Sequence, residues 1–202
     1  MKLGLFGGSF DPVHLGHLLV AQAAIEELEL DRLFFIPAAQ SPFKPANQPA
    51  PAAIRLQLLR LALAGNTKSE IDDQEIRRGG VSYTIETVRD YAKRFPQAEL
   101  FYLIGADNTV KLNEWREANE LARLTQFVVT LRPVWSSGFS RPEPPEGGTP
   151  NFPAPFRGRT LKGFPLAVSS SQVRARVKAG LSIEPLVPPP VAEAILAARL
   201  YT

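Results

Sequence analysis

The chain opens with the stretch Met1-Lys2-Leu3-Gly4-Leu5-Phe6-Gly7-Gly8-Ser9-Phe10-Asp11-Pro12-Val13-His14-Leu15-Gly16-His17. Its first six residues form a short apolar run, which is typical of a buried strand. The glycines that follow allow a tight turn, and residues 14–29 carry apolar side chains at helical spacing. This stretch therefore predicts a strand, a glycine-rich turn and the start of a helix.

The chain has two histidines, His14 and His17, and both stand at the start of this predicted helix. A helix start gathers backbone N–H groups without intrahelical partners and the positive end of the helix dipole, which together bind phosphate well. Side chains three positions apart can lie on the same side of a helix. We therefore expect both imidazoles to face one anion.

The alternation of strand and helix continues along the chain. Further strands are predicted over residues 32–37, 71–76, 99–104, 126–131 and 163–168, and helices over residues 52–64, 84–95, 172–178 and 190–200. Asp72, Glu75, Arg77 and Arg78 fit a solvated, charged strand edge. Strands separated by helices indicate a Rossmann-like, doubly wound α/β fold, with a mostly parallel sheet, helices on both faces and ligands at the carboxyl ends of the strands.

A single domain over residues 1–202 is expected, because this length suits one domain with an elaborated loop. Residues 133–159 are rich in proline, glycine and serine and are interpreted as that surface loop. Residues 170–202 are expected to form a C-terminal helical part. Its first helix follows Ser169-Ser170-Ser171, whose hydroxyls can cap it, so the chain has a second helix start suited to phosphate.

The composition excludes several classes of site. The chain has no cysteine, which rules out disulfides, thiolate zinc sites and a thiol nucleophile. The formal net charge of +3 favours anionic small molecules but is too small for a nucleic-acid footprint. No basic leader is seen, and no apolar run approaches the roughly 20 residues of a membrane helix, so we expect a cytoplasmic protein without membrane contact.

Two separated motifs resemble one superfamily. They are Gly7-Gly8-Ser9-Phe10-Asp11-Pro12-x-His14-x-Gly16-His17 and Ser169-Ser170-Ser171-x-x-Arg174, and together they resemble the nucleotidyltransferases that carry an H-x-G-H signature. The middle of the chain narrows this to a resemblance to bacterial nicotinate-mononucleotide adenylyltransferases, through Asp72-Asp73-Gln74-Glu75-Ile76-Arg77-Arg78-Gly79-Gly80-Val81-Ser82-Tyr83-Thr84-Ile85-Glu86-Thr87, Gly105-Ala106-Asp107-Asn108, Trp115 and Arg132-Pro133. The resemblance runs from residue 2 to about residue 180, apart from the proline-rich loop.

The resemblance implies an enzyme of NAD synthesis that joins ATP to nicotinate mononucleotide, giving deamido-NAD and pyrophosphate. Such a transfer needs no protein nucleophile when the 5′-phosphate of the acceptor attacks the α-phosphorus of ATP directly. Mg²⁺ is expected to arrive with the triphosphate, since no carboxylate cluster in the sequence suggests a dedicated metal cage. The sequence leaves the number of subunits open, a homo-oligomer included.

The resemblance also assigns roles to individual residues. The expected catalytic residues are His14, His17 and Arg174, with His17 donating to the α-phosphate as charge builds there. The expected ATP-binding residues are Gly7, Gly8, Ser9, Phe10, Gly16, Gly105, Asp107, Ser169 and Ser170. The expected nicotinate-mononucleotide-binding residues are Lys44, Ser82, Tyr83, Thr84, Trp115 and Arg132. An indole can stack on the pyridine ring, and backbone N–H groups near Thr84 can bind the nicotinate carboxylate and so select acid over amide.

Other functions are weighed against this one. A dinucleotide-binding dehydrogenase is disfavoured, because Gly4-x-x-Gly7-Gly8 does not fit G-x-G-x-x-G and no acidic residue ends the second strand. Adenylyl transfer to nicotinamide mononucleotide or phosphopantetheine, and a nucleotide-binding module without turnover, stay open as alternatives. One departure from the family pattern is Ser41-Pro42-Phe43-Lys44, where family members often have Pro-His-Lys, and it affects the contact made by that loop.

Overall fold

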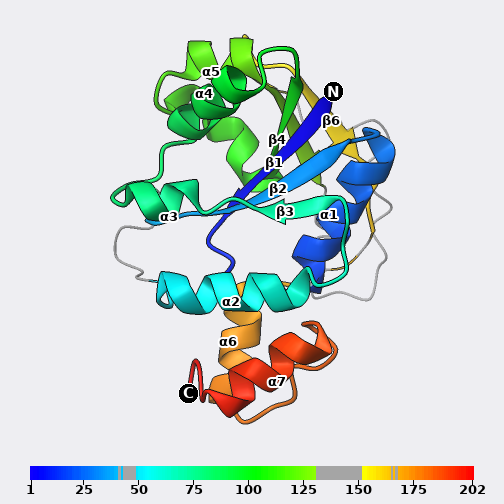
Figure 1. The fold of residues 1–202 in the computed structure, drawn as a ribbon, viewed down its shortest axis with the longest axis vertical. Helices are drawn as coiled ribbons and strands as arrows, with labels where there is room; N and C mark the ends of the chain where they lie inside the picture. The colour runs from blue at the N-terminus through cyan, green and yellow to red at the C-terminus, as the bar shows by residue number, and fades with distance from the viewer. Residues whose placement is uncertain (41, 43–48, 131–151, 165, 167) are drawn as a thin grey trace.

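The computed structural model describes residues 1–40, 42, 49–130, 152–164, 166 and 168–202. Within these residues the strands form a six-stranded sheet in the order β3-β2-β1-β4-β5-β6, and every neighbouring pair runs parallel (Figure 1). The strands are β1 Lys2–Gly8, β2 Arg32–Pro37, β3 Ser69–Ile71, β4 Glu99–Gly105, β5 Gln126–Thr130 and β6 Gly158–Leu161. The strand order reverses between β1 and β4, and ligands bind at such a switch point in open parallel sheets.

Helices cover both faces of the sheet (Figure 1). They are α1 Leu15–Glu27, α2 Ala52–Ala62, α3 Gln74–Arg78, α4 Thr84–Arg94, the 3-10 helix η1 Ala106–Glu114, α5 Ala118–Leu124, α6 Ser170–Lys178 and α7 Pro189–Ala197. Helices α1, α2, α6 and α7 contribute to one core cluster, and α4, α5 and η1 contribute to a second cluster on the other face. The predicted Rossmann-like, doubly wound fold is therefore confirmed.

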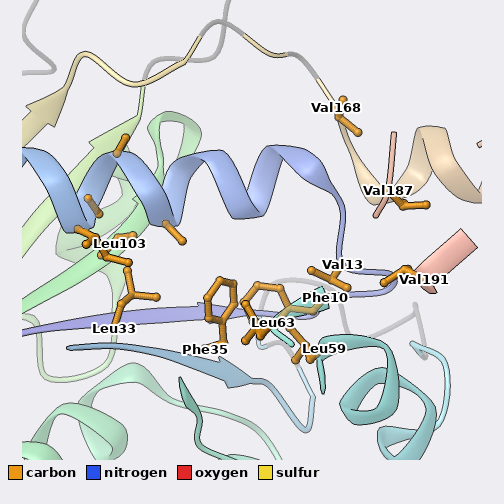
Figure 2. Close-up of a cluster of buried hydrophobic side chains, with 14 of the residues drawn as sticks. Phe10, Val13, Leu33, Phe35, Leu59, Leu63, Leu103, Val168, Val187 and Val191 are labelled. Atoms are coloured by element: carbon orange, nitrogen blue, oxygen red, sulfur yellow. The ribbon is translucent and has the colours of Figure 1, made fainter. Parts of the chain in front are cut away.

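Strand β2 shows why the central strands are apolar at nearly every position. Phe34 and Ile36 belong to the cluster on the α4 face, whereas Leu33 and Phe35 belong to the cluster on the α1 face. Side chains alternate between the faces of a sheet, so a strand covered on both faces needs a continuous apolar run. Figure 2 shows Phe35 beside Phe10 of the glycine-rich turn, and the two ring centroids are 5.4 Å apart.

Two predictions for individual strands were wrong. The last strand is β6 Gly158–Leu161, at the end of the segment interpreted as loop, and the described residues of 163–168 have no regular structure. Pro165 in the predicted strand has no N–H to donate to a ladder, whereas β6 is a short edge strand with two of its four residues exposed, and it pairs with β5. The strand predicted over residues 71–76 ends at Ile71 and gives way to α3.

The interpretation of residues 72–78 as a solvated strand edge was also wrong for its carboxylates. Asp72 and Glu75 are only 8% and 3% exposed. The Asp72 carboxylate accepts hydrogen bonds from the Tyr91 hydroxyl at 2.7 Å and from Arg94 Nη1 at 2.9 Å. Burial opposes the charge, yet the hydrogen bonds from Tyr91 and Arg94 lower the pKa of Asp72 below its ordinary value. The pair of residues is therefore buried, and Asp72 ties α3 to α4.

Candidate active site

A cleft of about 940 Å³ opens at the carboxyl ends of β1 and β4, at the switch point of the sheet. Its walls come from the glycine-rich turn, the start of α1, the end of β4 and the start of α6. The turn and α6 are far apart in the sequence but touch in the fold. Ser170 Oγ donates to the Pro12 carbonyl oxygen across a separation of 158 residues. The fold therefore brings both predicted helix starts to one cavity.

The two histidines are fixed against each other at the start of α1. His14 is the N-cap, and its Nδ1 accepts from the His17 backbone N–H at 3.3 Å, while His17 Nδ1 accepts from the His14 N–H at 3.2 Å. The two rings stack with their centroids 3.7 Å apart. Because each Nδ1 accepts a hydrogen bond, the neutral form of each ring carries its proton on Nε2. The expectation that both imidazoles lie on one side of the helix is confirmed.

The glycine-rich turn approaches its neighbours closely. A Cβ on Gly7 would lie 2.1 Å from the Tyr102 hydroxyl oxygen, so no larger residue fits at that position without movement. Phe10 adopts a φ of 46°, a left-handed conformation that is unfavourable for a residue with a side chain. Its ring is 1% exposed and packs against Phe6, Phe35 and His17. The Phe10 side chain thus anchors the turn in the core.

The start of α6 contacts this turn directly. Ser169 is the N-cap of α6, and its hydroxyl accepts from the Gln172 N–H at 3.2 Å. Arg174 Nη1 donates to the backbone carbonyl oxygen of Asp11 at 2.6 Å and lies 3.8 Å from Asp11 Oδ2. A helix N-terminus, serine hydroxyls and a guanidinium at one end of a cleft form a typical environment for phosphate oxygens.

The other end of the cleft combines an aromatic wall with the start of α4. Trp115 packs edge-on against Tyr102, with the ring centroids 6.4 Å apart. The Thr84 hydroxyl donates to the Tyr102 hydroxyl at 3.4 Å. Burial raises the pKa of Tyr102, so its hydroxyl stays neutral. Helix α4 starts at Thr84 and its N-cap residue makes no side-chain capping hydrogen bond, which leaves the helix start to other acceptors.

Most of the predicted site residues line this one cleft. They are Gly7, Gly8, Ser9, Phe10, His14, Gly16, His17, Ser82, Thr84, Gly105, Trp115, Ser169, Ser170 and Arg174. Tyr83 is not among the lining residues, and the Arg116 guanidinium lies over its ring at 4.6 Å from the centroid. Asp107 belongs to η1, and Lys44 and Arg132 lie outside the described residues. The role of each residue stays a prediction.

Several residues of the cleft were not predicted from the sequence. Asp11, Glu75, Tyr102 and Tyr201 line it, and Arg55 lies directly behind the turn. Arg55 is 1% exposed and donates to the carbonyl oxygen of Ser9 at 2.8 Å and to that of Ala50 at 2.9 Å. The sequence pattern could have predicted burial of Arg55, because it lies three and four residues before Leu58 and Leu59, on the apolar face of α2. No comparable signal existed for Tyr201.

Among the residues that the structure describes, no three His, Cys, Asp or Glu side chains are grouped so that they could hold a metal ion. Within the same part of the chain, every helix is too short or too polar to cross a membrane.

The parallel sheet, its switch-point cleft and its two helix starts place the protein in the Rossmann-like α/β class. Residues 5–176 match the sequence profile of the cytidylyltransferase-like family. The chain belongs to this family.

Two relatives of known name show which members of the family this chain is similar to. The chain is 43% identical over 188 residues to a protein of Opitutus terrae named probable nicotinate-nucleotide adenylyltransferase, covering 93% of this chain and 91% of that protein. It is 40% identical over 202 residues to the protein of the same name from Exiguobacterium sibiricum, covering 100% of this chain and 99% of the relative. The resemblance found in the motifs is therefore confirmed.

Solved structures agree with the fold. The structure of Plasmodium falciparum nicotinic acid mononucleotide adenylyltransferase complexed with NaAD superposes with a TM-score of 0.75, covering 99% of this chain and 97% of that one. The same protein complexed with APC gives a TM-score of 0.72, covering 99% of this chain and 96% of that one. Sequence identity is 15% in both cases, so these likenesses support the fold alone.

Proposed function

We propose that this protein transfers the adenylyl group of ATP to nicotinate mononucleotide, giving deamido-NAD and pyrophosphate in NAD synthesis. The observation that carries the proposal is the convergence of two helix starts, α1 with its histidine pair and α6 with Arg174, on a single cleft. The relatives that match over nearly the whole chain are named for the same activity. The substrates are thus two small anionic molecules.

The ATP end of the cleft is the end with the histidines. We assign the polyphosphate to the space between the starts of α1 and α6, because backbone N–H groups and Arg174 can neutralise its charge there. Ser169 and Ser170 supply further polar contacts at the start of α6. Gly7 and Gly8 line the cleft beside Tyr102 and Phe10, whose side chains occupy the space that a Cβ on either glycine would need.

The acceptor end of the cleft is the end with Trp115. The indole can stack on the electron-poor pyridine ring, and Ser82 and Thr84 line the same part of the cavity. The start of α4 at Thr84 lacks a side-chain cap, so its backbone N–H groups and dipole suit a carboxylate. A neutral amide gains less from that dipole, which favours nicotinate over nicotinamide.

The reaction we propose is a direct displacement. An oxygen of the acceptor 5′-phosphate forms a bond to the α-phosphorus of ATP, the bond between that phosphorus and the bridging oxygen to the β-phosphate breaks, and pyrophosphate leaves with the electron pair. Nε2 of His17 donates to an α-phosphate oxygen, and this hydrogen bond strengthens as negative charge builds in the transition state. His14 holds the ring of His17 in place through the paired Nδ1 contacts and the stacking of the two rings.

We propose that Mg²⁺ enters as part of the substrate, MgATP. Octahedral Mg²⁺ commonly keeps several waters and binds through substrate phosphates. In the described part of the chain the polar side chains at the ATP end are hydroxyls, imidazoles, a guanidinium and one carboxylate, that of Asp11, which already accepts hydrogen bonds from Tyr201 and Ala50. A single carboxylate does not make a metal cage, so the phosphates of ATP are expected to supply further ligands for Mg²⁺. We place this activity in the cytoplasm.

The decisive experiment is a coupled assay of pyrophosphate release with ATP and nicotinate mononucleotide. Parallel reactions with nicotinamide mononucleotide and with phosphopantetheine as acceptors test the neighbouring activities. The proposal predicts the highest kcat/KM for nicotinate mononucleotide. No turnover at millimolar substrate would contradict it, and calorimetric binding of ATP without product would point to a module that binds nucleotides only.

A first prediction concerns His17. The variant His17→Ala should lower kcat by about 10²–10³-fold with a smaller change in KM for MgATP, because the lost contact acts mainly in the transition state. Steady-state kinetics with each substrate varied in turn measures the split. A kcat close to that of the wild type would show that His17 has been given the wrong role.

A further inference from the structure

Four side chains from outside the turn bind the segment that connects β1 to the histidines. Arg55 binds the carbonyl oxygen of Ser9, Arg174 binds that of Asp11, and Ser170 binds that of Pro12. The fourth side chain comes from the far end of the chain, where the Tyr201 hydroxyl donates to Asp11 Oδ1 at 2.8 Å across a separation of 190 residues. The family match ends at residue 176, well before Tyr201.

The carboxylate of Asp11 has two hydrogen-bond donors and one nearby cation. Its Oδ1 accepts from the Tyr201 hydroxyl and from the Ala50 backbone N–H at 3.2 Å, and its Oδ2 lies 3.8 Å from Arg174 Nη1. Asp11 is only 8% exposed, so it depends on protein donors to replace its hydration. If one donor is removed, the nearest cation becomes a stronger partner for the carboxylate.

Tyr201 is suited to this task at every physiological pH. Burial, followed by the hydrogen bond to Asp11, raises the pKa of the Tyr201 hydroxyl far above its ordinary value, so that it remains a donor. The residue also lines the cleft, on the same side as Arg174 and Asp11. The C-terminal turn therefore reaches the polyphosphate end of the site.

We propose that Tyr201 is a positioning residue for ATP: its hydroxyl satisfies the Asp11 carboxylate and so leaves the Arg174 guanidinium available to the polyphosphate. The inference rests on the proposed placement of ATP between the starts of α1 and α6. Tyr201 acts through Asp11 and Arg174 and takes no part in the bonds that form or break. The effect of its loss should therefore appear in ATP binding rather than in acceptor binding.

The test is Tyr201→Phe, which removes the hydroxyl and keeps the ring. Calorimetric titration with MgATP in the absence of acceptor should give a Kd about fivefold higher than that of the wild type, as expected for a coupled polar network. In steady-state kinetics, KM for MgATP should rise by a similar factor, while kcat and KM for nicotinate mononucleotide change less than about twofold. Unchanged MgATP binding overturns the proposal.

The variant Asp11→Asn distinguishes an effect of Tyr201 that acts through Asp11 and Arg174 from a direct contact between Tyr201 and MgATP. Asparagine keeps an oxygen for the hydroxyl but has no charge to draw Arg174 away, so adding Tyr201→Phe to Asp11→Asn should change the Kd for MgATP less than about twofold. The same fivefold loss in both backgrounds overturns the proposal. If Asp11→Asn does not fold, a crystal structure of Tyr201→Phe decides, because the 3.8 Å gap from Arg174 Nη1 to Asp11 Oδ2 should close to about 2.8 Å.

Tyr91→Phe is the matched control. It removes an equivalent hydrogen bond from a tyrosine hydroxyl to a buried aspartate, Asp72, at 2.7 Å, and neither residue lines the cleft. It should lower the melting temperature about as much as Tyr201→Phe while leaving the Kd for MgATP unchanged. Should wild-type protein bind MgATP and give no product with nicotinate mononucleotide, the proposed acceptor is wrong, and the titrations still decide the role of Tyr201.

Discussion

Two buried aspartates, Asp11 and Asp72, receive the same kinds of partner and use them differently. Each accepts a hydrogen bond from a tyrosine hydroxyl, at 2.8 Å for Asp11 and 2.7 Å for Asp72. Each also has an arginine nearby. At Asp72, Arg94 Nη1 lies 2.9 Å from the carboxylate and Arg77 Nη2 lies 3.8 Å from it. At Asp11, Arg174 Nη1 lies 3.8 Å from the carboxylate and donates instead to the Asp11 backbone carbonyl.

The difference follows from the position of each aspartate in the fold. Asp72 joins α3 to α4 away from the cleft, and its ion pair with Arg94 is closed by direct charge-assisted hydrogen bonding. Asp11 lines the cleft, where an arginine closed onto a carboxylate would be lost to an anionic substrate. The same residue types thus stabilise the fold at one place and keep a cation ready at the other.

Replacing the two arginines, Arg174 and Arg94, is expected to give the largest effects and tests the contrast between the two aspartates most directly. Arg174→Ala should lower kcat/KM for MgATP by about 10²–10³-fold, because the developing charge on the polyphosphate loses a guanidinium partner. Arg94→Ala should leave kcat/KM within about twofold of the wild type and instead lower the free energy of unfolding by about 1–2 kcal/mol. Steady-state kinetics measures kcat/KM of both variants, and urea denaturation measures their free energies of unfolding.

A result at either arginine can contradict the proposed difference between Asp11 and Asp72. A strong loss of activity in Arg94→Ala with wild-type stability would mean that the Asp72 pair serves the reaction. A wild-type kcat/KM in Arg174→Ala would mean that the gap between Arg174 and the Asp11 carboxylate has no function. Arg174→Lys, which keeps the charge but not the planar fork, should recover only part of the lost activity.

The sequence predicted the central strands β2, β1, β4 and β5 and the two helix starts that line the cleft, because these depend on local patterns. The apolar run of β2 and the glycines and histidines after β1 each carry their own signal within about ten residues. The confirmed helices α2 and α4 likewise have apolar side chains at helical spacing. Helix α5 and the 3-10 helix η1 were not predicted: α5 has only seven residues, and a 3-10 helix has three residues per turn, so its pattern differs from that of an α-helix.

What the sequence could not predict is the set of contacts between distant segments. Tyr201 and Asp11 are 190 residues apart, and a tyrosine near the end of a chain gives no sign of its partner. Asp72 and Glu75 appeared to be surface charges because burial of a carboxylate depends on partners such as Tyr91 and Thr87 from α4. Edge strand β6 depends on pairing with β5 rather than on its own four residues.

A further prediction sharpens the comparison at Arg55, the buried arginine behind the Asp11 turn. Arg55→Met should lower the free energy of unfolding by about 2–4 kcal/mol, because the carbonyl oxygens of Ser9 and Ala50 lose a charged donor in a buried place. The matched control is Arg60→Met on the exposed side of the same helix, expected to change stability by less than about 0.5 kcal/mol. Denaturation in urea compares the two, and equal losses would show that Arg55 does not hold the turn.

The smallest expected effect is the dependence of stability on pH at Asp72. Its pKa in the folded protein lies below the ordinary value of 3.8, so the folded state binds the proton less readily than the unfolded state. The resulting stabilisation is complete above pH 3.8 and is lost as the pH falls through the folded pKa. Asp72→Asn cannot ionise, so the difference in free energy of unfolding between wild type and Asp72→Asn should be constant from about pH 5 to 8 and shrink below about pH 4. A gap that stays constant down to pH 2 would mean that the charge of Asp72, unlike its shape, contributes nothing to the fold.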